Sequence, residues 1–141
     1  MPPLRILICH RHPIVRSGLR VLLEPEPGIR IVAEAANGAE ALALTDYWRP
    51  DIVILDLNLT QMTGISAARE IIRKGHKARI VFVTGYSDEE YIAEAFKAGA
   101  HAFVLAASAQ TDLIHAVRAV AQERRFLSPG LTSKLQDAES A

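Results

Sequence analysis

The fold is decided by the stretch Asp51-Ile52-Val53-Ile54-Leu55-Asp56-Leu57-Asn58-Leu59. Its central residues, 52–55, are apolar without alternation, which is typical of a parallel strand that helices bury on both faces. The run ends in Asp56, so we expect this carboxylate where the strand leaves the carboxyl edge of the sheet. An aspartate there can simply cap the following turn. The buried strand before it favours a functional carboxylate, because a turn aspartate needs no such approach.

Further apolar runs alternate with helical patterns along the chain. Strands are predicted at 4–9, 29–33, 79–84 and 102–105, and helices at 13–24, 39–47, 65–72, 89–98 and 113–121. Strand and helix in regular alternation, with short connections, predict a parallel sheet with helices on both faces and right-handed crossovers. We expect one domain over residues 1–125, followed by a linker or tail over 126–141.

The composition excludes several classes of protein. The 141 residues include 16 basic and 16 acidic side chains. The chain therefore lacks the excess of basic residues that is typical of a free-standing nucleic-acid-binding domain. The single cysteine excludes an internal disulfide and is compatible with a reducing compartment. The first apolar stretch is too short for a signal peptide, and no run is long enough to span a bilayer. We expect a cytoplasmic protein that contacts neither membrane nor nucleic acid directly.

Several segments together resemble the receiver domain of two-component response regulators over residues 4–124. They are residues 12–20 (HPIVRSGLR), 51–57 (DIVILDL), 64–65 (GI) and 98–100 (AGA). The resemblance is closest to receivers that precede a helix-turn-helix DNA-binding domain, and residues 125–129 (RFLSP) resemble the start of the linker in that subgroup. It implies a flavodoxin-like α/β fold, a three-layer (βα)5 sandwich with a five-stranded parallel sheet of order 2-1-3-4-5.

The same resemblance implies a phosphoryl-transfer site. Asp56 matches the position that accepts a phosphoryl group from a histidine kinase. Thr84 matches the hydroxyl that contacts this group, and Phe103 matches the aromatic switch residue of the fifth strand. Transfer spreads negative charge over the phosphoryl oxygens, so cations and positioning supply most of the catalysis. Family members provide them with an acidic pair that binds Mg²⁺ and with a lysine.

This sequence departs from the family at those positions. His10 and Arg11 replace the acidic pair, Ala106 replaces the lysine, and Thr60 replaces a proline. Mg²⁺ requires oxygen ligands, which an imidazole and a guanidinium do not offer. A weak Mg²⁺ site would have to use Asp56 and the backbone carbonyl of Asn58. We therefore expect a degenerate receiver without a resident cofactor.

Two local hypotheses follow from these replacements. Arg11 either pairs with the carboxylate of Asp56, supplying the missing positive charge, or points into solvent. Cys9, His10 and His12 have the chemistry of soft-metal ligands. Against a metal site, Cys9 continues an apolar strand toward the core and His12 is well placed to cap a helix.

The leading functional hypothesis is a signalling module, not an enzyme, that acts through protein contacts. Its expected partners are a sensor histidine kinase or another signalling protein, and the apolar stripe of the last helix suggests a homodimer. A second hypothesis retains slow phosphorylation of Asp56, with Arg11 and His10 replacing the metal. A third makes the chain the receiver of a transcription factor whose DNA-binding half is absent from this sequence. Cofactor binding of the flavodoxin kind is the weakest, because no phosphate cradle follows the first strand.

Overall fold

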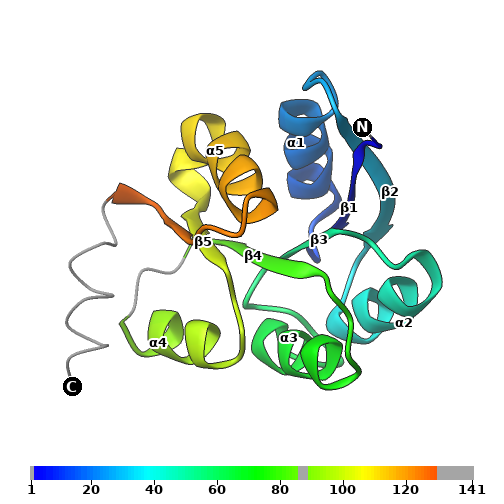
Figure 1. Cartoon of the computed structure of the whole chain (residues 1–141). Helices are drawn as coiled ribbons and strands as arrows, with labels where there is room; N and C mark the ends of the chain where they lie inside the picture. The colour runs from blue at the N-terminus through cyan, green and yellow to red at the C-terminus, as the bar shows by residue number, and fades with distance from the viewer. Residues whose placement is uncertain (1, 86–88, 130–141) are drawn as a thin grey trace.

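The computed structural model describes residues 2–85 and 89–129, and in this part of the chain six parallel strands form one sheet (Figure 1). The strands lie in the order β2-β1-β3-β4-β5-β6. Their bounds are β1 (Leu4–Cys9), β2 (Ile29–Ala35), β3 (Ile52–Leu55), β4 (Arg79–Thr84), β5 (Ala102–Leu105) and β6 (Phe126–Leu127). The flavodoxin-like parallel sheet and the order of its first five strands are confirmed. The predicted count of five is wrong by one, because residues at the start of the predicted tail pair with β5.

Helices cover both faces of this sheet. They are α1 (Pro13–Leu23), α2 (Gly38–Trp48), α3 (Gly64–Arg73), α4 (Glu89–Lys97) and α5 (Ala109–Ala121), with a short 3-10 helix η1 (Ala106–Ser108) before α5. Figure 1 shows α1 and α5 on one face, and α2, α3 and α4 on the other. No helix within the described residues has the length and apolar character needed to cross a membrane.

The strand β3 shows why the deciding stretch does not alternate between apolar and polar residues. Val53 and Leu55 join the core cluster under α2, α3 and α4, whereas Ile52 and Ile54 join the cluster under α1 and α5. All four side chains are at most 1% exposed. Because both faces of the strand are buried, its residues are apolar on both, and the strand delivers the next residue, Asp56, to the carboxyl edge of the sheet.

The sixth strand is fixed to the free edge of β5. The amide of Phe126 donates to the carbonyl of His101 (3.2 Å), and the amide of Ser128 donates to that of Phe103 (3.0 Å). The hydroxyl of Ser128 accepts a hydrogen bond from the amide of Leu105 (3.0 Å) and donates one to Oδ2 of Asp112 (2.8 Å). Residues 126–128 therefore lie on the sheet, and residues 130–141 of the predicted tail fall outside the described residues.

Candidate functional site

Asp56 lies where the sequence pattern predicts it, at the carboxyl edge of the sheet. It follows β3 directly, and its backbone amide donates to the carbonyl of Cys9 at the end of β1 (3.3 Å). The residue is only 6% exposed. After β1 the chain continues to β2 on one side of the sheet, and after β3 it continues to β4 on the other side. The crevice between the carboxyl ends of β1 and β3 is therefore the position where open α/β sheets place ligands.

The side chain that faces Asp56 is His10. Its Nε2 atom lies 3.3 Å from Oδ2 of Asp56. The other ring nitrogen, Nδ1, accepts a hydrogen bond from the backbone amide of His12 (3.1 Å). A neutral imidazole has one N–H, so occupation of Nδ1 by a donor places the proton on Nε2, toward the carboxylate. Burial lowers the pKa of His10 despite the opposing charge of Asp56, which favours this neutral form.

Arg11 does not take part in this contact. Its side chain is exposed, and Nε donates to Nε2 of His12 (3.1 Å). The structure describes both Arg11 and Asp56 and shows no ion pair between them, so of the two alternatives left open by the sequence the pairing is wrong and the solvent-facing one is confirmed. The physical reason is the turn into α1: the bond from the amide of His12 brings the ring of His10 inward and leaves the next side chain outside.

The soft-metal hypothesis for Cys9, His10 and His12 is not supported by their positions. Cys9 is 1% exposed, and its Sγ donates to the carbonyl of Asn37 (3.4 Å). Burial raises the pKa of the thiol to about 12, whereas a metal ligand must be a thiolate. Within residues 2–85 and 89–129 there is no group of three His, Cys, Asp or Glu side chains arranged to hold a metal ion. His12 is the N-cap residue of α1, as predicted, although its side chain makes no capping hydrogen bond.

The remaining predicted site residues divide between the core and the surface. Thr84 ends β4, is 1% exposed and pairs in register with Leu105, one residue before Ala106. Ala106 is exposed at the start of η1. Phe103 is fully buried, and its ring lies 6.1 Å from that of Phe82 between centroids. Asn58 and Thr60, beyond Asp56, are both exposed.

Two glycines hold the loop that follows Asp56, and their role was missed from the sequence. A Cβ on Gly64 would lie 2.0 Å from the backbone oxygen of Asp56. A Cβ on Gly38 would lie 2.2 Å from the carbonyl oxygen of Met62, and the amide of Gly38 donates to the carbonyl of Thr60 (3.2 Å). The loop is therefore packed between the first residues of α2 and α3 at distances that only glycine permits. Thr60, where relatives of the implied family carry proline, takes part through its backbone.

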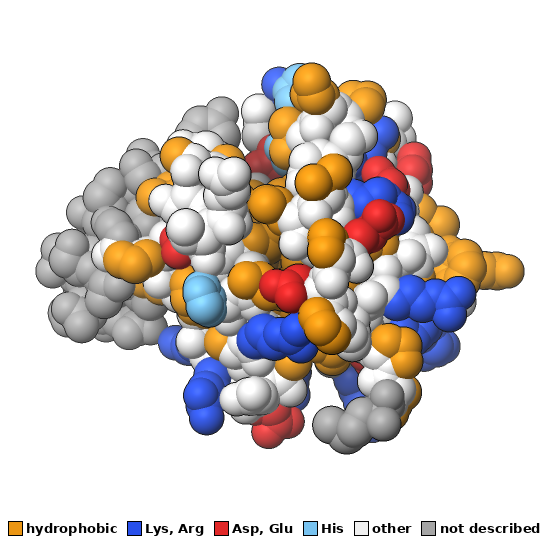
Figure 2. Space-filling model, turned by 90° about the horizontal axis from the view of Figure 1, so that it is seen from above, with side chains coloured by type: hydrophobic (Ala, Val, Ile, Leu, Met, Phe, Trp, Pro, Cys, Tyr) orange, Lys and Arg blue, Asp and Glu red, His pale blue; other side chains and the backbone are white. Residues whose placement is uncertain are grey.

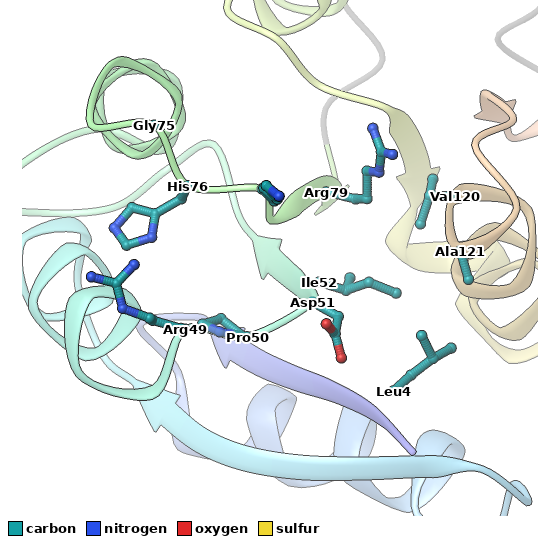
Figure 3. Close-up of a pocket in the computed structure, with 11 residues that line it drawn as sticks. Leu4, Arg49, Pro50, Asp51, Ile52, Gly75, His76, Arg79, Val120 and Ala121 are labelled. Atoms are coloured by element: carbon teal, nitrogen blue, oxygen red, sulfur yellow. The ribbon is translucent and has the colours of Figure 1, made fainter. Parts of the chain in front are cut away.

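A separate cavity of about 480 Å³ opens at the opposite, amino edge of the sheet (Figure 3). Its lining includes the cationic residues Arg49, Lys77 and Arg79 together with Asp51. The C-terminal ends of α2, α3 and α5 border it, and cations near such ends offset the partial negative charge of the helix dipole. The helix ends therefore account for the positive lining, and the cavity contributes nothing to the site at Asp56.

The fold and the buried aspartate after its central strand define a receiver. The chain belongs to the response regulator receiver domain family, whose model matches residues 6–118. It is 37% identical to a crystal structure of a two-component response regulator of the LuxR family from Aurantimonas sp. SI85-9A1, with a TM-score of 0.92 and 99% of each chain covered. It also resembles the signal receiver domain of the putative response regulator NarL from Mycobacterium tuberculosis, at 27% identity, with a TM-score of 0.85 and 88% and 100% of the two chains covered.

Curated relatives extend the resemblance to named regulators. The nitrate/nitrite response regulator protein NarP of Escherichia coli is 33% identical, over 97% of this chain and 64% of its own length. The transcriptional regulatory protein DegU of Brevibacillus brevis is 29% identical, over 94% of this chain and 56% of its own length. The chain thus spans about three fifths of the length of these curated relatives. The predicted resemblance to response-regulator receivers is confirmed.

Proposed function

We propose that this receiver domain signals through protein contacts, without Mg²⁺-dependent phosphorylation of Asp56. The observation that carries the proposal is the contact between His10 Nε2 and Asp56 Oδ2 (3.3 Å). At this position the family resemblance implies a carboxylate that helps to bind the metal. The imidazole of His10 instead lies beside the acceptor oxygen, on the side from which a phosphoryl donor would approach.

The residues around Asp56 do not fit a magnesium ion. Mg²⁺ demands oxygen ligands in nearly octahedral geometry, usually including more than one carboxylate. Within the described residues no three His, Cys, Asp or Glu side chains are arranged to hold a metal ion, and Oδ2 of Asp56 already lies 3.3 Å from Nε2 of His10. Ala106 offers no ammonium group to the phosphoryl oxygens. Since phosphoryl transfer depends on such charges, the usual reaction loses most of its catalysis here.

A signalling role without phosphorylation requires a surface for a partner. The expected homodimer rested on the apolar stripe of α5, but Leu113, Val117 and Val120 are fully buried against the sheet and cannot serve it. Exposed apolar side chains lie instead on α1, where Ile14 is 83% and Val21 is 69% exposed. Figure 2 shows hydrophobic side chains gathered along this face of the molecule. A sensor histidine kinase, another signalling protein or a second copy would bind there, in the cytoplasm and without an enzymatic step by this chain.

A second candidate is a conventional phosphoacceptor that controls a DNA-binding output. The names of the relatives favour it, since they include transcriptional regulatory proteins of which this chain spans about three fifths. In that case Asp56 accepts the phosphoryl group and Thr84 and Phe103 transmit its presence.

Intact-protein mass after incubation with acetyl phosphate separates the two candidates. The wild type is compared with and without Mg²⁺, and Asp56→Asn is the control for the site of addition. The proposal predicts no Mg²⁺-dependent adduct above that of Asp56→Asn. A phosphoryl adduct that requires both Mg²⁺ and Asp56 would overturn the proposal and establish the conventional acceptor.

A further inference from the structure

We propose that Arg16, on the first turns of α1, is a positioning residue that holds His10 against Asp56. The inference rests on the proposed function in one respect, namely that the contact between His10 and Asp56 is the resting arrangement of the site. It assigns a role to a residue whose side chain bonds neither the carboxylate of Asp56 nor the imidazole ring of His10.

The side chain of Arg16 connects the turn after β1 with β2. Its Nη1 donates to the backbone carbonyl of His10 (2.5 Å), and its Nε lies 3.4 Å from Oε1 of Glu34 on β2. Its own backbone amide donates to the carbonyl of His12 (3.1 Å). The side chain is only 17% exposed. The side chain of Arg16 therefore joins the start of the turn between β1 and α1 to the neighbouring strand, and its backbone amide holds the end of that turn.

This turn determines the direction of the His10 ring. The ring is set by the hydrogen bond from the amide of His12 to Nδ1, which exists only while the turn keeps its shape. The side chain of His12 makes no capping bond that would hold the turn. A planar guanidinium, with five donors in fixed directions, bonds a carbonyl and a carboxylate at once, whereas a lysine ammonium lacks this fork.

Arg20, one turn further along α1, provides a matched control. It also pairs with Glu34 (2.7 Å), and it forms a second ion pair with Glu24. Its hydrogen bonds and ion pairs go to Glu24 and Glu34, and none goes to His10. A substitution of Arg20 therefore disturbs the same helix face and the same carboxylate of Glu34 while leaving the turn untouched.

The effect of the charge of Arg16 on the pKa of His10 must be separated from its effect on the position of the His10 ring. The charged or titratable groups that act on His10 are Asp56, which raises its pKa, and His12, Arg11 and Arg16, which lower it. Removal of the positive charge of Arg16 would raise the pKa of His10 even if the ring did not move. Arg16→Lys keeps that charge and removes the fork, so it is the informative variant.

The test is the imidazole proton and nitrogen NMR spectrum of the full chain, titrated with pH. In the wild type and in Arg20→Lys we expect a hydrogen-bonded Nε2–H resonance of His10 and a pKa below the ordinary value. In Arg16→Lys we expect this resonance to disappear and the pKa to rise toward the ordinary value, with the backbone amide spectrum still dispersed. Should the lysine variant not fold, Arg16→Gln replaces it with the Nε2–H resonance as the one readout, because the loss of charge alone raises the pKa of His10.

An Arg16→Lys spectrum identical to that of Arg20→Lys would overturn the positioning role and leave the contact between His10 and Asp56 intact. A wild type without the Nε2–H resonance would overturn both, because the contact that supports the proposed function would then be absent in solution.

Discussion

His10 Nε2 lies 3.3 Å from Oδ2 of Asp56, while the other ring nitrogen of His10 accepts a hydrogen bond from the backbone amide of His12. In the neutral form of the imidazole, this arrangement places the ring N–H on the side of the buried carboxylate. It also couples the protonation of His10 to the stability of the fold, since a second proton on Nδ1 would face the amide of His12.

The first prediction is that stability falls as the pH drops below neutrality and that His10 causes part of this fall. The pKa of His10 lies below its ordinary value of 6.5 in the folded state, mainly through burial. Between the lowered pKa and 6.5 the unfolded chain binds a proton that the folded chain does not, so the free energy of unfolding decreases with falling pH. His101, whose pKa is also lowered by burial, adds in the same direction.

Replacement of His10 by glutamine measures how much of this loss of stability is due to His10. Glutamine keeps a neutral N–H donor for Asp56 and does not titrate. Urea unfolding between about pH 7 and pH 5 should therefore show a shallower loss of stability in His10→Gln than in the wild type. Equal slopes for the two proteins would contradict a neutral, buried His10.

The second prediction concerns the glycine at the start of α3. In Gly64→Ala the new Cβ would lie 2.0 Å from the backbone oxygen of Asp56, a contact that requires the loop to move. We expect a loss of about 1–3 kcal/mol, as is usual for overpacking at a buried position. Gly18→Ala in α1 is the matched control, because no heavy atom lies within 4 Å of its added Cβ. That change should stabilise the helix by roughly 0.5–1 kcal/mol. Equal effects in urea unfolding would show that the loop after Asp56 is not tightly packed.

The third prediction is that Ser128 anchors β6. Its buried hydroxyl joins the amide of Leu105 to the carboxylate of Asp112, so Ser128→Ala leaves both groups without this partner. We expect a loss of about 1–3 kcal/mol and faster hydrogen exchange at the amide of Leu105. The exposed Ser17 on α1 is the control, since its replacement by alanine should change stability by less than about 0.5 kcal/mol. Unchanged exchange at Leu105 would mean that β6 is not held in this way in solution.

The sequence was sufficient for the central strand and for Asp56, because an unbroken apolar run of this length, ending in a carboxylate, is typical of a parallel strand buried on both faces. It was insufficient for β6. Two residues carry no periodic pattern, and their pairing with β5 depends on a free strand edge that only the assembled sheet provides.

Side-chain direction limited the prediction of the site. His10 and Arg11 are neighbours, and the sequence left open whether Arg11 would pair with Asp56 or point into solvent. The ring of His10 faces Asp56 instead, because the amide of His12 and the guanidinium of Arg16 fix the turn. Both contacts involve a backbone amide or carbonyl group, and no sequence motif predicts them. The close contact of Gly38 with the loop after Asp56 could not be predicted from the sequence either, because it depends on how α2 packs against that loop.

The central claim is that the residues beside Asp56 prevent Mg²⁺-dependent phosphorylation. It is tested most directly by intact-protein mass of two proteins, side by side, after acetyl phosphate and Mg²⁺. One is the wild type, and the other combines His10→Asp, Arg11→Asp and Ala106→Lys, which supplies the carboxylates and the ammonium group of the family. The account predicts a Mg²⁺-dependent phosphoryl adduct in the triple variant and none in the wild type. An adduct of equal yield in the wild type would contradict it.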